Sequence, residues 1–231
     1  MKRADGILSD SGMFTRSEAR KAIAEGRVFA NGKKITSPSE KTDENAVITV
    51  DGKEINTEKY IYLMMNKPAG YVCENGGERS VLSLVPKEFY RKGLFTVGRL
   101  DKDTEGLLLI TNDGDFAHSV VSPKKNIEKL YFAELEREVM AADTAAFANG
   151  FELKNGEKFA PAILEKGEGK TALVTVSEGK FHEVKRLFLL TGNAVLYLKR
   201  LKIGGLLLDT SLSAGESRAL TAEEKDLIFS E

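Results

Sequence analysis

The chain has 231 residues, of which 42% are hydrophobic and 30% charged, enough for a small domain and a larger one with its own core. Its apolar runs fall far short of the roughly 18 residues that cross a bilayer, and its N-terminus lacks the apolar segment of a signal peptide. One cysteine, Cys73, excludes an internal disulfide and, with only two histidines, argues against a His/Cys zinc site. We therefore expect a cytoplasmic protein with no membrane partner.

The charge is unevenly distributed along the chain. A net charge of −1 argues against indiscriminate binding of nucleic acid. Residues 1–34 nevertheless hold eight Lys or Arg against four Asp or Glu, and residues 177–202 hold six against two. These two basic stretches fit either solvated surfaces or contacts with nucleic acid, and only a motif can decide between them.

The first 55 residues predict a helix followed by short strands. A capping box, Thr15-Arg16-Ser17-Glu18, opens the helix, and Gly26 ends it. Short apolar runs then precede two turn sequences, Asn31-Gly32 and Asp51-Gly52. Three arginines are spaced to share much of one exposed side: Arg16, Arg20 and Arg27.

The run TRSEARKAIAEGRVFANGK, residues 15–33, resembles the alpha-L RNA-binding motif first described in a small-subunit ribosomal protein. The resemblance implies that a basic helix face and the following turn rest on RNA phosphates, through Arg16, Arg20, Arg27 and Lys33. At residues 3–6, Arg-Ala-Asp-Gly stands where the family commonly has Arg-Leu-Asp-Lys, a departure that would weaken the first helix or one phosphate contact. A small helix–hairpin unit without a ligand is the alternative.

Beyond a polar linker at residues 56–59, strand-like patterns dominate. Strands are expected at residues 60–65, 94–97, 107–110, 130–135, 171–176 and 194–203. Helices are expected at residues 141–148 and 181–190 and from the capping box at residue 221, with a loop and short helix at 76–92 and a turn at 112–115. Strands outnumber helices without βαβ alternation, which favours a mainly antiparallel sheet.

An acidic loop joins two of these strands and is the main candidate site. The sequence GRLDKDTEGLL, residues 98–108, places Asp101, Asp103 and Glu105 within five positions. An EF-hand calcium loop would need Glu at its twelfth position, which is Asn112, and helices on both sides. A paired-carboxylate hydrolase lacks a designated partner, because residues two apart on an extended chain point to opposite faces. A solvated turn, with Asp101 accepting backbone hydrogen bonds, is the other alternative.

Ordered sequence blocks resemble the pseudouridine synthases, specifically the branch that modifies ribosomal RNA and includes the small-subunit enzyme A. The acidic loop carries the family signature as GRLD-x-x-T-x-GL at residues 98–107. Further blocks are NKP-x-GY at 66–71, TNDG at 111–114, EK-x-Y at 128–131, EG-x-x-H-x-VKR at 178–186 and IGGL at 203–206. Chain length and the lack of a long basic tail favour the small-subunit branch over large-subunit relatives.

The resemblance assigns catalytic roles to three residues. Asp101 is the carboxylate that acts as nucleophile or as base at the sugar. Lys185 is the cation that keeps the pKa of this carboxylate low, with Arg186 as the fallback. Tyr131 is the aromatic platform for a uridine that leaves its stack. Four further residues are expected to bind the substrate: Arg99, Thr104, Arg186 and Leu206.

The implied reaction converts one uridine of ribosomal RNA, most directly 16S rRNA, to pseudouridine. The glycosidic bond breaks, the base turns, and the sugar rejoins through carbon 5. Since this involves no redox change and no hydrolysis, we expect no cofactor and no metal. The expected partner is ribosomal RNA or a small-subunit assembly intermediate, and the expected state is a monomer. A 23S rRNA enzyme and a non-catalytic RNA-binding or ribosome-assembly factor are the alternatives. His182 is expected near RNA at the start of a helix.

The elements and the two resemblances together predict an α+β protein of two domains. Residues 1–58 form a small N-terminal α/β RNA-binding domain with its linker. Residues 59–231 form a larger catalytic domain, in which helices and loops flank a mainly antiparallel mixed sheet.

Overall fold

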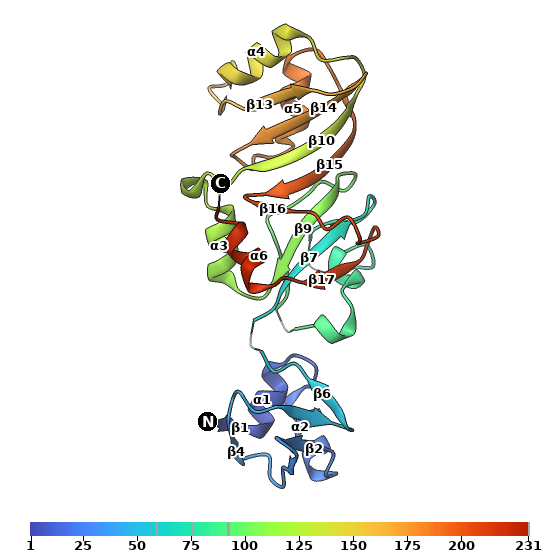
Figure 1. Ribbon diagram of the computed structural model, residues 1–231, viewed down its shortest axis with the longest axis vertical. Coiled ribbons are helices and arrows are strands. Elements are labelled where there is room, and N and C mark those ends of the chain that lie inside the picture. The colour runs from blue at the N-terminus through green and yellow to red at the C-terminus, as the bar shows by residue number, and fades with distance from the viewer. Residues whose placement is uncertain (59, 75, 92, 231) are drawn as a thin grey trace. The chain divides into compact units, whose positions relative to one another are not determined.

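The computed structural model describes residues 1–58, 60–74, 76–91 and 93–230, which form two compact units (Figure 1). The first unit comprises Met1–Ile61 with Val85–Leu94, and the second comprises Tyr62–Leu84 with Phe95–Glu231. Lys59 and Lys92, which end the expected linker and the expected loop-and-helix segment, lie outside the described residues. The domain boundary between residues 58 and 59 stays a prediction.

The first unit packs two helices and a small antiparallel sheet around one apolar core. The helices are α1 (Ala4–Asp10) and α2 (Arg16–Ala24). The sheet has the order β3 (Lys33–Lys34), β2 (Val28–Ala30), β5 (Ile48–Val50) and β6 (Lys53–Ile55), and β1 (Lys2–Arg3) pairs separately with β4 (Lys41–Thr42).

Local sequence signals explain most of the first unit. The side chain of Thr15 accepts from the amide of Glu18, and the Glu18 carboxylate accepts from the amide of Thr15, so the expected capping box opens α2. Helix α1 forms despite the departure at residues 3–6. Its Asp5 is buried and accepts hydrogen bonds from the guanidinium groups of Arg3 and Arg20. These ion pairs lower the pKa of Asp5, the hydrogen bond from Arg3 contributing most.

A mixed sheet organises the second unit. Its order is β13 (Ile163–Lys166), β14 (Thr171–Val176), β10 (Lys129–Leu135), β15 (Val195–Ile203), β9 (Glu105–Thr111), β7 (Tyr62–Lys67) and β17 (Ser217–Ala219). Strand β16 (Leu206–Leu207) pairs with β15, and β8 (Phe95–Val97) pairs with β9. Among the described strands only β9 and β15 run parallel. The predicted α+β class with a mainly antiparallel sheet is confirmed.

Helices cover the sheet in two groups, each with its own core. Helices α4 (Ala141–Asn149) and α5 (Glu183–Leu190) pack on the β13–β14–β10–β15 half, where Phe147 and Phe188 lie 5.0 Å apart between ring centroids. Helix α3 (Gly114–Val121) and the segment after α6 (Ala222–Leu227) contribute to the other core, which includes Ile228. The sequence predicted only a turn at residues 112–115, but the Asp113 side chain caps the first turn of α3.

The smaller elements are short. Strands β11 (Phe151–Glu152) and β12 (Lys158–Phe159) form a separate pair. Short 3-10 turns occur at Val81–Leu84, Lys87–Phe89 and Pro123–Lys125.

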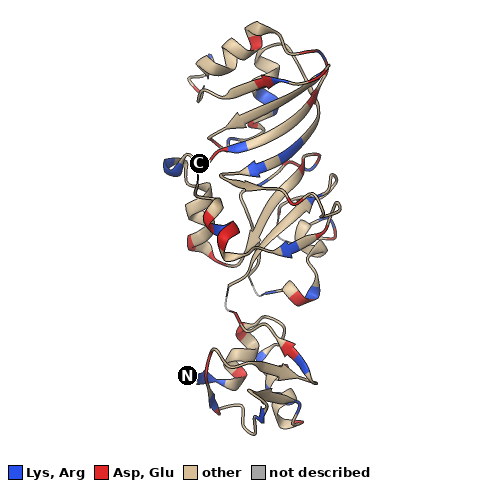
Figure 2. Cartoon of the chain, in the orientation of Figure 1, with Lys and Arg blue, Asp and Glu red and all other residues tan. Residues whose placement is uncertain are grey.

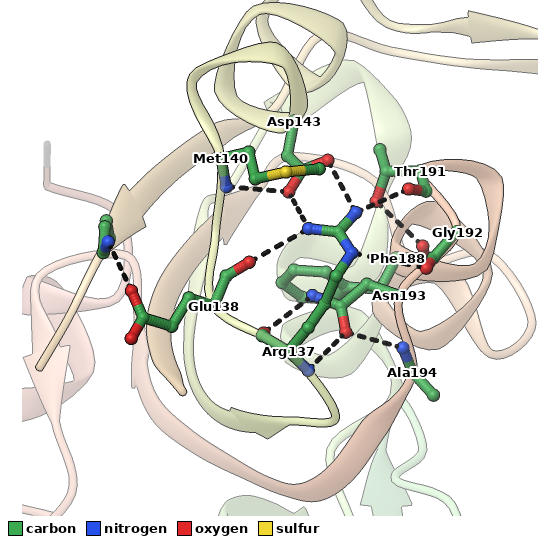
Figure 3. A network of polar contacts seen from close by, with 10 residues as sticks. Arg137, Glu138, Met140, Asp143, Phe188, Thr191, Gly192, Asn193 and Ala194 are labelled. Atoms are coloured by element: carbon green, nitrogen blue, oxygen red, sulfur yellow. Dashed lines mark hydrogen bonds and ion pairs between the residues drawn. The ribbon is translucent and has the colours of Figure 1, made fainter. Parts of the chain in front are cut away.

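A polar network ties the end of α5 to the start of α4 (Figure 3). The guanidinium of Arg137 donates to both carboxylate oxygens of Asp143, at 2.6 and 3.0 Å, and to the carbonyl of Thr191 at 2.7 Å. The Asn193 side chain accepts from the Arg137 amide at 3.1 Å and donates to its carbonyl at 3.0 Å. The network satisfies carbonyls at the C-terminal end of α5, so it fixes the helix that carries Lys185.

We predict that Asp143→Ala lowers the free energy of unfolding by about 2 kcal/mol or more, because it removes the carboxylate that accepts from the Arg137 guanidinium and from the Met140 amide. Urea denaturation followed by circular dichroism measures this loss. Glu138→Ala is the matched control, since the Glu138–Lys166 ion pair belongs to the same region but is half exposed. Equal stability losses in the two variants would contradict the prediction.

Candidate active site

A cavity of about 150 Å³ opens in the second unit, next to the acidic loop. It is small beside the roughly 300–1,000 Å³ of pockets for drug-sized ligands, so it suits a single ring. Its walls come from residues 97–101 and 104, the end of α3, β10, residues 179–180 and 182–185, and β15. Five predicted site residues line it: Arg99, Asp101, Thr104, Tyr131 and Lys185.

Asp101 lies between two nitrogen groups. Its carboxylate is 3.2 Å from the ammonium of Lys185 and 3.3 Å from Nε2 of His182, and its side chain is 24% exposed. The Lys185 ammonium also contacts Asp103 at 2.6 Å. Burial lowers the pKa of Lys185, but its hydrogen bonds to Asp103 and Asp101 outweigh burial, so the net pKa is raised. Lys185 therefore stays charged and holds its ammonium against the Asp101 carboxylate.

His182 reaches the carboxylate through an unusual backbone conformation. Its φ of 50° and ψ of 35° place it in the left-handed region immediately before α5. Its ring stacks on Phe181, with centroids 3.7 Å apart and an interplanar angle of 21°. The sequence placed His182 correctly at a helix start but gave no sign of its contact with Asp101, which depends on a residue 81 positions away.

The acidic loop is held from beneath by a buried lysine. The ammonium of Lys67, at the end of β7, donates to the carbonyls of Pro68, Lys102 and Thr104, at 3.0, 3.3 and 2.8 Å. Lys67 is fully buried, and burial lowers its pKa. These three carbonyls replace the lost water contacts of the ammonium. The bonds to Lys102 and Thr104 fix the backbone on both sides of Asp103. From the sequence alone, Lys67 belongs to the NKP-x-GY block and has no predicted role.

The loop joins the other half of the sheet at Gly106. Strands β9 and β15 pair in parallel through Glu105–Lys199 and Gly106–Arg200. Gly106 has a φ of 98°, and a Cβ at this position would overlap the backbone of Arg200. The hydroxyl of Tyr197 donates to Glu105 at 2.7 Å across the same junction. This close approach brings β15 to the end of the acidic loop.

Arg200 forms the cavity wall beside Tyr131. Its Nε donates to the carbonyl of Leu107 at 2.8 Å, and its Nη1 lies 3.4 Å from the Tyr131 hydroxyl. Arg200 is 5% exposed and Thr104 is 1% exposed. Within the described residues, Nη2 of Arg200 and the hydroxyl of Thr104 have no hydrogen-bond partner. Each such group costs about 1–3 kcal/mol, a cost that polar atoms of a bound molecule can offset.

Two further ionisable groups complete the cavity. The ammonium of Lys129 donates to the carbonyls of Ser177 and Glu178, and burial and then the charge of Arg200 lower its pKa. Burial, followed by the nearby charge of Glu178, raises the pKa of Glu183 to about 7. Neither Lys129 nor Glu183 is predicted as a site residue from the sequence, because their burial depends on how β10 and α5 pack together.

Two predicted substrate residues do not line the cavity. Arg186 forms a bidentate ion pair with Glu157, at 2.9 and 2.5 Å, and its guanidinium lies 4.6 Å from the centroid of the Phe159 ring. Adjacent helix positions point in different directions, so only Lys185 reaches Asp101. Leu206 is 2% exposed and packs in the core with Ile203. Other side chains supply the apolar lining of the cavity, among them Val97, Val120, Val121, Leu198 and Ile203.

The four expected RNA-binding residues lie in the first unit with different partners. Arg16 and Lys33 are exposed. Arg20 contacts Asp5 at 3.1 Å. Arg27 donates to Asp51 at 2.7 Å and to Glu25 at 2.9 Å. Arg16 and Arg20 belong to α2, whereas Arg27 follows it.

Comparison with known proteins identifies the family. Residues 61–192 match the family model for RNA pseudouridylate synthase, and residues 2–48 match the S4 domain. The chain belongs to the RNA pseudouridylate synthase family. The predicted N-terminal RNA-binding motif is confirmed as an S4 domain, and the chain is an enzyme of the RNA pseudouridine synthase type.

Relatives match this RNA pseudouridine synthase over nearly its whole length. The ribosomal small subunit pseudouridine synthase A of Vibrio cholerae is 40% identical, over 96% of this chain and 97% of that protein. An uncharacterized RNA pseudouridine synthase of Bacillus subtilis is 39% identical, over 98% of each. A crystal structure of a pseudouridylate synthase covers 99% of this chain and 100% of its own, with 37% identity and a TM-score of 0.69.

The described part of this synthase contains no helix with the length and apolar character needed to cross a membrane. Across the same residues, no group of three or more His, Cys, Asp or Glu is arranged to hold a metal ion.

We predict that Gly106→Ala destabilises the second unit by about 3 kcal/mol or more, because it combines a strained φ with overlap at the Arg200 backbone. Gly114→Ala is the matched control. Gly114 is the first residue of α3, and a Cβ there would meet nothing within 4 Å, so this variant should be neutral or slightly stabilising. Thermal unfolding measures both, and an unaltered melting temperature for Gly106→Ala would contradict the prediction.

A second prediction concerns pH. Because folding raises the pKa of Glu183 from 4.5 to about 7, the folded state binds more protons than the unfolded state between these values. This contribution to stability is complete below pH 4.5 and is lost as the pH rises to about 7. Glu183→Gln should remove this loss. The free energy of unfolding of the variant, measured relative to wild type, should therefore be higher at pH 8 than at pH 4.5 by at most about 3 kcal/mol. Urea denaturation across this range measures it.

The control for the pH experiment is Glu165→Gln, at an exposed position of edge strand β13. It should leave the pH dependence of stability as in wild type. A Glu183→Gln profile parallel to wild type from pH 4.5 to 8 would show that Glu183 is not the group responsible.

Proposed function

We propose that this chain isomerises a specific uridine of 16S ribosomal RNA to pseudouridine, acting as a cytoplasmic monomer. The observation that supports this most is the contact of Asp101 with Lys185 in a cavity sized for one ring, with Tyr131 on its wall. Similarity to enzymes named ribosomal small subunit pseudouridine synthase A supports the choice of 16S rRNA.

In the proposed reaction, the bond between the sugar and N1 of uracil breaks and a bond between the sugar and C5 forms. The proton on C5 is lost and N1 gains one, so atoms and charge balance without an oxidant or a water molecule. Asp101 either attacks the sugar or removes a sugar proton. In both routes Lys185 and His182 hold the carboxylate in position through their contacts at 3.2 and 3.3 Å.

The other residues of the cavity hold the base. Tyr131 stacks on the flipped uracil, which recovers roughly 1–3 kcal/mol of lost stacking. Arg99 and Thr104 contact the uridine from the acidic loop. Arg186 and Leu206 act indirectly, since Arg186 anchors Glu157 and Leu206 packs in the core behind β15.

The S4 domain supplies affinity for RNA in this proposal. Arg16 and Lys33 contact phosphates directly because both side chains are exposed. Arg20 and Arg27 already pair with carboxylates, so they contribute less unless RNA displaces Asp5 or Asp51. The second unit also carries cations, on β10 and β15 (Figure 2).

The experiment that tests the function uses RNA labelled with tritium at C5 of uridine, because isomerisation releases that tritium to water. Purified protein is incubated with 16S rRNA, with partly assembled small subunits and with 23S rRNA. Release from 16S rRNA or the small-subunit particle supports the proposal. Release from 23S rRNA alone would identify a large-subunit enzyme, and release from none would leave a non-catalytic RNA-binding factor.

We predict that Asp101→Asn lowers the rate of tritium release by about 10³-fold or more, because the amide can neither attack the sugar nor accept its proton. RNA affinity should remain within a few-fold. Asp103→Asn is the matched control. Asp103 contacts the same Lys185, but its side chain is 75% exposed, so this variant should keep most of the activity. Substantial turnover by Asp101→Asn would show that another group performs the chemistry.

A further inference from the structure

We infer that Phe181 is a stacking platform for an unpaired RNA base that flanks the target uridine. This inference rests on the proposed function and adds a contact outside the cavity. Phe181 lies in the segment between β14 and α5, and its neighbours Lys180 and His182 both line the cavity. Phe181 itself does not, so its ring stands at the rim.

The exposure of this ring is exceptional for its type. Phe181 is 67% exposed, more than any other aromatic residue in the described part of the chain. Packing within this unit therefore does not account for its position. It also lies within residues 177–202, where six Lys or Arg stand against two Asp or Glu. Exposed aromatic rings are the surfaces on which proteins that bind single-stranded RNA stack bases.

The ring is held in place before any ligand arrives. One face stacks on the imidazole of His182, whose left-handed backbone conformation turns that ring toward Phe181. His182 in turn contacts Asp101 at 3.3 Å. A platform that is already ordered loses little conformational entropy on binding. Since the stack ends on Asp101, a base on Phe181 also steadies the reacting carboxylate.

Base flipping explains why such a platform is useful. When the uridine enters the cavity, its neighbour in the RNA loses a stacking partner. An aromatic ring at the rim replaces that partner and lowers the cost of extrusion. Every base presents a flat face, so Phe181 favours an unpaired neighbour without selecting one base over another.

The first test compares Phe181→Ala, Phe181→Leu and Phe181→Tyr on the RNA that the wild type modifies. We expect KM to rise about 5- to 100-fold for Ala and Leu, which lack a ring, with a smaller change in kcat. Phe181→Tyr keeps the ring and should stay within about twofold of wild type. Leu189→Ala, which trims a similarly exposed side chain of α5, is the matched control and should leave KM unchanged.

The second test removes the base instead of the ring. Wild type acting on RNA with an abasic nucleotide beside the uridine should show the same rise in KM, and Phe181→Ala should add no further rise on that RNA. A Phe181→Leu variant equal to wild type, or additive losses on abasic RNA, would overturn the inference.

Absence of tritium release by wild type refutes the proposed function instead. In that case, the stacking role of Phe181 is tested by the quenching of 2-aminopurine fluorescence in bound single-stranded RNA. Quenching that Phe181→Leu abolishes supports the platform, and unchanged quenching overturns it.

Discussion

The parallel pairing of β9 with β15 at Gly106 is the constraint on which the site depends. Asp101 precedes β9, whereas Tyr131 and Lys185 belong to elements packed on the other half of the sheet. The two halves meet through two residue pairs, and the glycine lets the backbones approach to the distance required. Three sets of contacts position the elements around the cavity: this strand pairing, the hydrogen bonds from Lys67 to three carbonyls, and the Arg137 network at the C-terminal end of α5.

Charge in the cavity is divided between two walls. On one side the Lys185 ammonium compensates Asp101, and Nε2 of His182 contacts the same carboxylate. On the other side Arg200 is buried and Lys129 is partly buried, and neither forms an ion pair within the part of the chain described. Backbone carbonyls accept hydrogen bonds from both, and Arg200 also contacts the Tyr131 hydroxyl. Burying a cation without a carboxylate is costly, and oxygen-rich ligands such as nucleotides repay that cost. The arrangement suits an enzyme that binds an RNA segment while a lysine and a histidine hold one carboxylate in place.

Sequence patterns predicted the elements whose signals are local. The Thr15–Glu18 capping box, the helix around residues 141–148 and the strand at 171–176 follow from residues within one turn or one strand. Helix α3 and strand β13 were missed, as was the parallel pairing at Gly106, because strand order and register depend on distant residues. Motif resemblance brought Asp101, Tyr131 and Lys185 together. It could not reveal the contacts of Lys67, His182 and Arg200, since those are long-range bonds to backbone or to other motifs.

The pairing of β7 with β17 and the burial of Ile228 bear on the order in which the chain matures during synthesis. The first unit can fold once residue 94 has left the ribosome. Strand β7, by contrast, waits for residues 217–219, and its core waits for Ile228. The S4 domain can therefore fold well before the isomerase half is complete. Because the candidate active site lies in that half, activity waits for the chain as far as Ile228.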